Sequence, residues 1–187
     1  MVKKNACVFI SGYGSNLKSL IKHSRDYRFP INIKLVVCNN VDAKGVLHAK
    51  KNSIPFLIID TKKNIYESYL LNKMHKYRIS LICLAGYMKI IPKKFIKKFG
   101  KKIINIHPSL LPKYKGLNTF KRILKEKEKE TGCTVHFVNE KLDDGKIIVQ
   151  KKFFIEKKDN IEILKEKTQR LEYKAFAEAI VNIYRYN

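Results

Sequence analysis

The chain has 187 residues, 45% of them hydrophobic, and a formal net charge of +24 at pH 7. This length allows one substantial hydrophobic core, so we expect residues 1–187 to form a single domain. No run approaches the roughly 20 apolar residues of a membrane span and the N-terminus has no signal-peptide pattern, which predicts a soluble, cytoplasmic protein without a membrane partner.

The positive charge comes mainly from lysines that are spread along the whole chain. Only six of the 40 basic residues are arginine, the residue that contacts bases and phosphates through two parallel hydrogen bonds. Three explanations are open: an AT-rich coding bias, attraction of anionic small molecules and, a distant third, nucleic-acid binding. Lysine, isoleucine and asparagine are abundant together, which favours the first. We therefore expect no specific nucleic-acid partner.

The cysteines and histidines show no metal-site spacing. Cys7, Cys38, Cys83 and Cys133 form no C-x-x-C pair, and three of them lie in apolar runs. This pattern favours reduced core residues over disulfides or zinc ligands. The five histidines are likewise scattered. The sequence therefore predicts no metal.

The first hundred residues alternate between strand and helix patterns. Short continuous apolar runs bounded by turn residues indicate buried strands, and apolar residues at helical spacing indicate amphipathic helices. Strands are expected at 6–10, 31–38, 55–59, 79–85 and 102–106, and helices at 15–24, 41–49, 64–77 and from about 92. Such units are typical of an α/β fold with a doubly wound, mostly parallel sheet and helices on both faces.

The pattern changes after about residue 118. A helix is expected over 121–130, where the alternating charges of 125–130 predict a solvated face with ion pairs one helical turn apart. Two longer strands at 133–138 and 146–154 predict an antiparallel extension of the sheet. One long helix over 160–186 closes the chain.

A glycine-rich turn from Ser11 to Leu17 lies between the first strand and the first helix. The N–H groups and positive dipole end of a helix N-terminus can bind a phosphate, and glycine lets the backbone approach it closely. Ser15 and Asn16 can add capping hydrogen bonds. Leu17 occupies the third glycine position of the dinucleotide motif, which disfavours NAD. Taken alone, the turn fits an ordinary helix start equally well.

The segment from Asn105 to Gly116 follows the last apolar strand of this half. Asn105 and His107 are two apart on an extended chain and so point to one face. There an amide and a titratable imidazole can steady a developing oxyanion. Two prolines and Gly116 then stiffen the loop. An Asn-x-His pair alone is more often a hydrogen-bonded strand end.

The whole run Asn105-Ile106-His107-Pro108-Ser109-Leu110-Leu111-Pro112 resembles the signature loop of the formyltetrahydrofolate-dependent formyltransferases. The turn from Ile10 to Leu17 resembles the loop with which the family's purine-pathway member holds the phosphate of glycinamide ribonucleotide. Relatives that formylate other amines, or that hydrolyse formyltetrahydrofolate, generally lack this turn. The resemblance covers nearly the whole chain.

This resemblance implies that 10-formyltetrahydrofolate, as co-substrate, gives its formyl group to the amine of 5'-phosphoribosylglycinamide in de novo purine biosynthesis. Folate hydrolysis and formyl transfer to another amine are alternatives within the enzymes. A basic nucleic-acid-binding protein is a distant alternative from another class. The oligomeric state, monomer or homodimer, is left open.

The resemblance also implies the site residues. Asn105 and His107 would act with Asp143, which matches the family's essential aspartate in Leu142-Asp143-Asp144-Gly145. Asp143 would favour a protonated His107, which would stabilise the oxyanion and donate a proton. Implied ribonucleotide contacts are Gly14, Ser15, Asn16, Leu17, Lys18, Gln169 and Glu172. Implied folate contacts are Lys63, Met88, Lys89, Ile90, Ile91, Asn139, Glu140, Lys141 and Leu142.

Three positions depart from the family pattern. Asp144 stands where glycine is usual, which leaves two adjacent carboxylates and one flexible residue fewer. Asn118 and Phe120 stand where relatives commonly have histidine. A proton relay through those two histidines is therefore absent from this chain.

Overall fold

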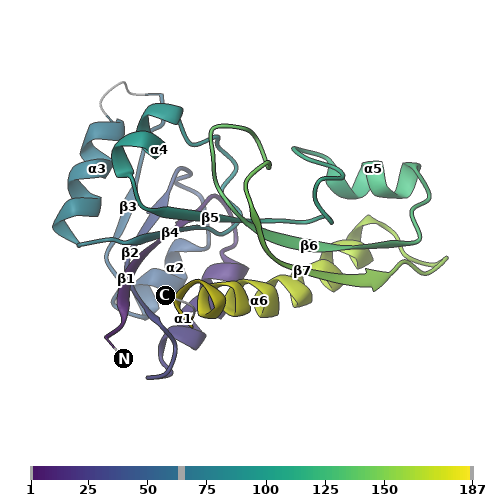
Figure 1. The fold of residues 1–187 in the computed structure, drawn as a ribbon, viewed down its shortest axis with the longest axis horizontal. Helices are drawn as coiled ribbons and strands as arrows, with labels where there is room; N and C mark the ends of the chain where they lie inside the picture. Colours follow the sequence, from purple (N-terminus) through teal and green to yellow (C-terminus); the bar gives the residue numbers. More distant parts are fainter. Residues whose placement is uncertain (1, 63–65, 186–187) are drawn as a thin grey trace. The chain divides into compact units, whose positions relative to one another are not determined.

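The computed structural model describes residues 2–62 and 66–185, and the chain divides into two compact units, Met1–Ile104 and Asn105–Asn187 (Figure 1). The first unit alternates strands and helices, as expected. Its elements are β1 (Lys4–Ile10), α1 (Ser15–Ser24), β2 (Ile31–Cys38), α2 (Val46–Lys51), β3 (Phe56–Ile58), α3 (Tyr66–Lys76), β4 (Leu81–Leu84) and α4 (Lys93–Phe99).

The strands of the first unit follow the order β3-β2-β1-β4, and each neighbouring pair is parallel. The chain steps outward from β1 to β2 and β3, then returns past β1 to β4. Because parallel crossovers are right-handed, this reversal puts α1 and α2 on one face of the strands and α3 on the other (Figure 1). The strand order reverses between β1 and β4, which is where open α/β sheets bind ligands at the strands' carboxyl ends.

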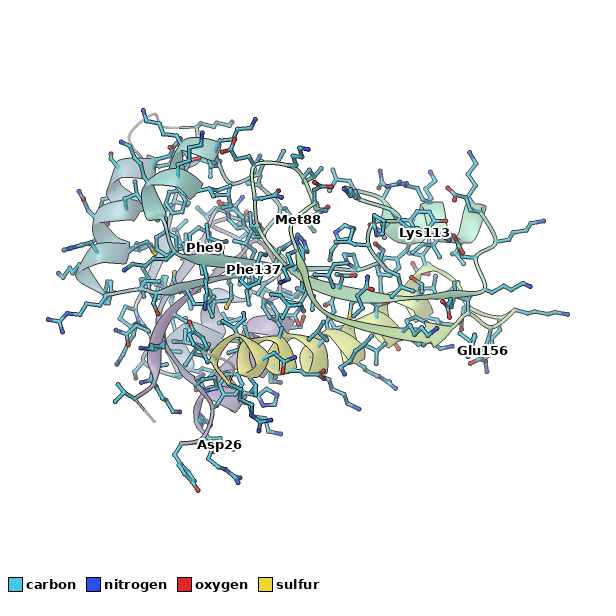
Figure 2. All side chains as sticks on the ribbon, viewed as in Figure 1. Phe9, Asp26, Met88, Lys113, Phe137 and Glu156 are labelled. Carbon is cyan, nitrogen blue, oxygen red and sulfur yellow. The ribbon has the colours of Figure 1, made fainter. Side chains whose placement is uncertain are left out.

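Burial explains why these strands are apolar throughout. Val8, Phe9 and Ile10 of β1 are 0% exposed, as expected for a central strand that is covered on both faces. Nitrogen-tipped side chains project from helices, strands and loops all along the chain (Figure 2), in agreement with the dispersed lysines of the sequence.

The second unit begins within β5 (Lys102–His107) and continues through α5 (Thr119–Lys125), β6 (Glu130–Phe137), β7 (Ile147–Phe154) and α6 (Ile161–Arg185). Its strands follow the order β5-β6-β7, and β6 pairs with β7 antiparallel. The long helix α6 packs along β6 and β7 (Figure 1) and buries Leu164, Phe176 and Ile180. The parallel strands, the antiparallel extension and the long final helix confirm the predicted fold class.

The helix expected over 121–130 is shorter than predicted. It ends at Lys125, and β6 already begins at Glu130. The backbone at Lys127 is left-handed, with φ 51°, which a right-handed helix cannot continue through. Glu128 accepts a hydrogen bond from Lys113 Nζ at 2.8 Å, and Glu130 accepts one from Lys152 Nζ at 3.0 Å. The predicted helix-spaced ion pairs were wrong, because these glutamates bond partners far along the chain.

The helix expected from residue 41 begins only at Val46, and Gly45, the residue before it, lies against the glycine-rich turn. Gly45 N donates to Gly12 O at 2.9 Å. A Cβ at Gly45 would lie 2.7 Å from Gly12 O and 2.8 Å from Ile10 Cδ1, so only glycine fits there without a shift. The start of α2 therefore supports the turn, a role that the sequence analysis did not assign to Gly45.

Candidate active site

The three predicted catalytic residues lie together in the second unit. Asn105 and His107 extend from the end of β5, and Asp143 lies on the loop between β6 and β7. Asp143 Oδ2 is 3.3 Å from His107 Nδ1, and Asn105 Nδ2 donates to Asp143 Oδ1 at 3.4 Å. The His107 and Asp143 side chains are each 7% exposed. An amide, an imidazole and a carboxylate thus meet in a site with little water.

A fourth polar side chain, His136 on β6, was not assigned from the sequence. It is 2% exposed, and its Nε2 lies 3.3 Å from Asn105 Nδ2 and 3.6 Å from Asp143 Oδ1. Its Nδ1 lies 2.8 Å from the carbonyl oxygen of Phe137. Since a carbonyl only accepts, Nδ1 carries a hydrogen, and a neutral His136 then accepts the Asn105 N–H at Nε2. The alternation along β6 puts His136 on the same face as Thr134, and this sequence pattern could have indicated that His136 faces the site.

Asp143 is ionised at neutral pH although it is nearly buried. Burial alone raises the pKa of a carboxyl group. Here the neighbouring His136 imidazole, the N–H of Gly116 at 2.9 Å and the His107 imidazole outweigh burial and lower the pKa of Asp143 to about 2. The carboxylate is therefore a fixed negative charge at the centre of the cluster.

His107 sits between two acceptors. Its Nε2 lies 2.8 Å from the carbonyl oxygen of Tyr114, so Nε2 carries a hydrogen, and its Nδ1 faces the ionised Asp143. Burial is nevertheless the largest influence and lowers the pKa of His107, against the opposing effects of the Tyr114 carbonyl and Asp143. Asp143 does favour the protonated form of His107, as expected, but burial outweighs it and favours the neutral ring.

The loop after β5 is fixed by hydrogen bonds to β6 and β7. The Thr134 hydroxyl donates to Ser109 O at 2.6 Å and accepts from Leu111 N at 3.0 Å. Gln150 Nε2 donates both to Leu111 O at 2.8 Å and to the Thr134 hydroxyl at 2.9 Å. Thr134 and Ser109 are 0% exposed, so this network satisfies polar groups that water does not reach.

The three residues that depart from the family pattern each have a definite place in the structure. Asp144 forms an ion pair with Lys115. Asn118 adopts the left-handed conformation at the start of α5, with φ 58°. Phe120 packs against the cluster of Tyr114, Ile123 and Leu164.

In the first unit, the glycine-rich turn leads from β1 into α1. Gly14 caps the helix with φ 71° and has no side chain to offer a capping bond. Ser15 is half-buried, Asn16 is buried and Lys18 is exposed. Leu17 is 0% exposed, so its side chain packs in the core and only its backbone is suited to contact a ligand. The first turn of α1 holds no acidic residue, which leaves its positive dipole end available to an anion.

The segment after β4 is tied to the same turn. The Ser11 hydroxyl accepts a hydrogen bond from Met88 N at 2.8 Å. Met88 is 71% and Ile90 76% exposed, so both apolar side chains are accessible to a ligand. Lys89 is exposed as well, whereas Ile91 is buried and serves packing.

The remaining predicted residues lie in separate places. Lys63 lies outside the described residues. The loop from Asn139 to Leu142 is exposed, with Lys141 N bonded to Asn139 Oδ1 at 2.9 Å. On α6, Gln169 is exposed and Glu172 is half-buried. Glu172 also lies near Cys133 of β6, whose thiol pKa is raised to about 12, mainly by burial and further by the Glu172 charge.

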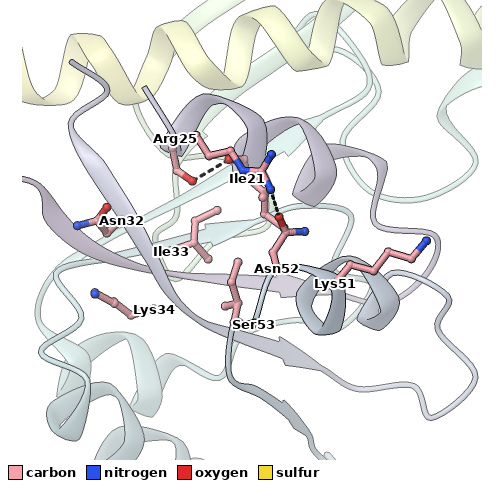
Figure 3. A pocket seen from close by; sticks show the side chains of 10 residues that line it. Ile21, Arg25, Asn32, Ile33, Lys34, Lys51, Asn52 and Ser53 are labelled. Carbon is pink, nitrogen blue, oxygen red and sulfur yellow. Dashed lines mark hydrogen bonds between the residues drawn. The ribbon is translucent and has the colours of Figure 1, made fainter. Parts of the chain in front are cut away.

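A pocket of about 440 Å³ lies elsewhere in the first unit (Figure 3), lined by residues that include Arg25, Asn32, Lys34, Lys51 and Asn52. Arg25 donates to Asn52 Oδ1 at 2.6 Å. Arg25 and Lys51 lie at the carboxyl ends of α1 and α2, whose partial negative charge favours basic side chains there. None of the predicted site residues that the structure describes lines this pocket.

Residues 2–62 and 66–185 contain no group of three or more histidine, cysteine, aspartate or glutamate side chains arranged to hold a metal ion. Within the same ranges, no helix is long and apolar enough to cross a membrane.

A protein family described as "Formyl transferase" matches residues 4–180. The chain belongs to the formyl transferase family. The match spans both units, including the glycine-rich turn, the loop after β5 and the segment that carries Asp143. The family resemblance predicted from the sequence is confirmed.

Similar proteins share most of this formyl transferase chain. A phosphoribosylglycinamide formyltransferase from Haemophilus influenzae is 41% identical over 177 residues, which cover 92% of this chain and 84% of the relative. The trifunctional purine biosynthetic protein adenosine-3 of Drosophila melanogaster is 40% identical over 95% of this chain, a match that spans 14% of that longer protein. The crystal structure of phosphoribosylglycinamide formyltransferase from Bacillus halodurans superposes with a TM-score of 0.92 at 30% identity, covering 98% of this chain and 97% of the other.

Asp143→Asn is expected to lose stability in a pH-dependent way. The pKa of Asp143 in the folded protein, about 2, lies below its ordinary value, so the ionised carboxylate stabilises the fold. This stabilisation is complete above about pH 4 and is lost as the pH falls through about 2. We expect the wild type to be more stable than the variant by on the order of 2 kcal/mol at pH 7, with roughly half of that difference left near pH 3. Urea unfolding at both pH values measures it.

Asp144→Asn is the matched control, because the Asp144 side chain is 38% exposed and an exposed ion pair contributes little. A loss in Asp143→Asn that is equal at both pH values would contradict the assigned ionisation.

Proposed function

We propose that this formyl transferase moves the formyl group of 10-formyltetrahydrofolate to the amine of 5'-phosphoribosylglycinamide, giving formylglycinamide ribonucleotide and tetrahydrofolate in de novo purine biosynthesis. The observation that carries the proposal is the cluster of Asn105, His107 and the ionised Asp143 at the end of β5. The names of the Haemophilus and Bacillus relatives support the choice of substrate. Action in the cytoplasm, as one formyltransferase domain in a monomer or homodimer, is part of the proposal.

The reaction needs an oxyanion donor. When the amine attacks the formyl carbon, a carbon–nitrogen bond forms and the formyl oxygen becomes negatively charged. The Asn105 amide contacts His136 at 3.3 Å and Asp143 at 3.4 Å. Both contacts are long, so Asn105 can turn one N–H toward the oxyanion at little cost.

The reaction also moves a proton from the attacking amine to N10 of the leaving folate. A neutral His107 at rest is suited to accept it, and the proton then completes the hydrogen bond between Nδ1 and the Asp143 carboxylate. The imidazolium formed in this way stabilises the neighbouring oxyanion. It returns the proton as the bond between the formyl carbon and N10 breaks. No covalent enzyme intermediate is required.

Substrate binding uses other residues of the chain. We assign the ribonucleotide phosphate to the turn from Gly14 to Lys18, since a helix N-terminus without an acidic residue suits an anion. Gln169 and Glu172 contact the rest of the ribonucleotide. The exposed Met88 and Ile90 fit the flat, apolar face of a pterin, and the loop 139–142 and Lys63 complete the proposed folate contacts.

An assay of tetrahydrofolate release with and without 5'-phosphoribosylglycinamide tests the proposal. We expect turnover only when the ribonucleotide is present. Release without it identifies a formyltetrahydrofolate hydrolase, and turnover only with other amines identifies a different transferase. Salt-sensitive nucleic-acid binding without any turnover would favour the basic nucleic-acid-binding alternative.

His107→Ala and Asp143→Asn are expected to lower kcat by about 10²- to 10⁴-fold, because each removes part of the proton-transfer pair. The KM for the ribonucleotide should stay nearly unchanged. Because the two side chains act together, the double variant should be scarcely worse than the poorer single variant. Asp144→Asn should be mild, since its carboxylate is paired with Lys115. Steady-state kinetics of these four variants test the prediction. Full activity of both His107→Ala and Asp143→Asn would rule out a proton-transfer role for the pair.

Gly12→Ala is expected to raise the KM for the ribonucleotide on the order of tenfold while leaving the KM for the folate unchanged. A Cβ at Gly12 meets no atom within 4 Å, so the variant should fold normally and only a bound phosphate would be crowded. Gly14 is a poorer choice, because its Cβ would lie 2.7 Å from Gly45 Cα at a φ of 71°. An unchanged ribonucleotide KM in Gly12→Ala would refute the phosphate assignment.

A further inference from the structure

Tyr114 connects His107 to a pair of glutamates outside the catalytic cluster. Its carbonyl oxygen lies 2.8 Å from His107 Nε2, while its hydroxyl lies 2.6 Å from Glu126 Oε2 and 2.8 Å from Glu128 Oε1. Glu128 is also bonded to Lys113 Nζ at 2.8 Å. The hydroxyl proton and the Lys113 ammonium offset the repulsion between the two carboxylates. One residue therefore joins the buried imidazole to the turn that follows α5.

The backbone of Tyr114 needs this support. Its φ of 58° is left-handed, a conformation that is unfavourable for a residue with a side chain. The Arg122 guanidinium lies 5.3 Å from the Tyr114 ring centre and also donates to Lys115 O at 2.7 Å. The ring itself packs against Ile123 and Leu164. These contacts, together with the two glutamates, hold Tyr114 in a conformation that it would otherwise leave.

This conformation aims two backbone groups at the catalytic pair. The Tyr114 carbonyl faces His107 Nε2, and two residues later the Gly116 N–H donates to Asp143 Oδ2 at 2.9 Å. The segment 114–116 thus gives His107 an acceptor and Asp143 a donor. Because a carbonyl can only accept, the neutral imidazole keeps its hydrogen on Nε2, and a transferred proton must enter at Nδ1, opposite Asp143.

We propose that Tyr114 is a positioning residue that fixes the orientation and tautomer of His107 through its carbonyl, and that Glu126 and Glu128 hold it in place through its hydroxyl. The inference rests on the proposed function for its catalytic consequence, but the tautomer itself does not depend on it. The charged or titratable groups that act on His107 are Asp143, His136 and Arg122. Burial, His136 and Arg122 lower the pKa of His107, whereas the Tyr114 carbonyl and Asp143 raise it.

Tyr114→Phe tests the proposal, because it keeps the ring and its contact with Arg122 and removes only the hydroxyl. We expect kcat to fall about three- to tenfold, with both KM values unchanged, as expected for loosening one hydrogen bond to the imidazole. Long-range ¹H–¹⁵N spectra of ¹⁵N-histidine-labelled protein near pH 8 read the tautomer of a neutral imidazole directly. The wild type should show His107 with hydrogen on Nε2, and the variant should show a mixture of both tautomers.

The His107→Ala spectrum identifies the signal among the five histidines. Tyr27→Phe is the matched control, since Tyr27 is 80% exposed, and it should change neither measurement. Glu126→Ala should cause part of the Tyr114→Phe effect, and Glu126→Gln, which keeps an acceptor oxygen, should restore wild-type values. These two variants replace Tyr114→Phe if that protein does not fold.

The outcomes separate this inference from the proposed function. A tautomer change in Tyr114→Phe with no formyl transfer by the wild type would support the positioning role and refute the function. An unchanged tautomer and kcat in the folded variants, with an active wild type, would overturn the positioning role alone. A rise in KM without a fall in kcat would also overturn it, since Tyr114 would then act on binding.

Discussion

The candidate active site depends on one nearly buried, ionised carboxylate. Asp143 is 7% exposed, and an unpaired charge in such a place would be strongly destabilising. Each of its oxygens therefore has partners: Asn105 and His136 lie against Oδ1, and His107 and Gly116 against Oδ2. These partners come from β5, from β6 and from the loop after β5, so the charge constrains the relative placement of all three. The same contacts that make the carboxylate tolerable arrange the groups to which we assign the proposed formyl transfer.

Opposing effects on the pKa of His107 determine its protonation state. The Tyr114 carbonyl and Asp143 favour the imidazolium, but burial is larger and favours the neutral ring. A ring that is neutral at rest, yet surrounded by two acceptors, gains a hydrogen bond to Asp143 when it is protonated. In the proposed reaction, proton uptake by His107 is therefore coupled to the appearance of negative charge on the substrate, when a nearby cation becomes favourable. Neither burial nor pairing alone would give this behaviour.

The sequence predicted what depends on local periodicity and failed where distant partners decide. Strand alternation was enough to put Asn105 and His107 on one face, and the continuous apolar runs identified the buried parallel strands. The helix over 121–130 was wrong because the glutamates of that segment bond Lys113, Tyr114 and Lys152, which no local pattern shows. His136 was missed for a related reason, since the role of a lone histidine in a strand shows only when the neighbouring strand supplies the Asn105 amide and the loop after β6 supplies the Asp143 carboxylate.

The positions that depart from the family pattern lie around the charge cluster and not within it. The Asp144 carboxylate pairs with Lys115 and stays partly exposed, so the second of two adjacent aspartates adds little to the buried site. Phe120 packs against Tyr114, the residue whose carbonyl faces His107. The groups inside the cluster must supply particular donors, acceptors and charges at fixed distances. The surrounding residues need only hold the segment 114–116 in place, and that requirement can be met by an aromatic ring or an ion pair. The residues around the cluster can therefore differ from the family pattern while the groups inside the cluster, and the chemistry proposed for them, stay the same.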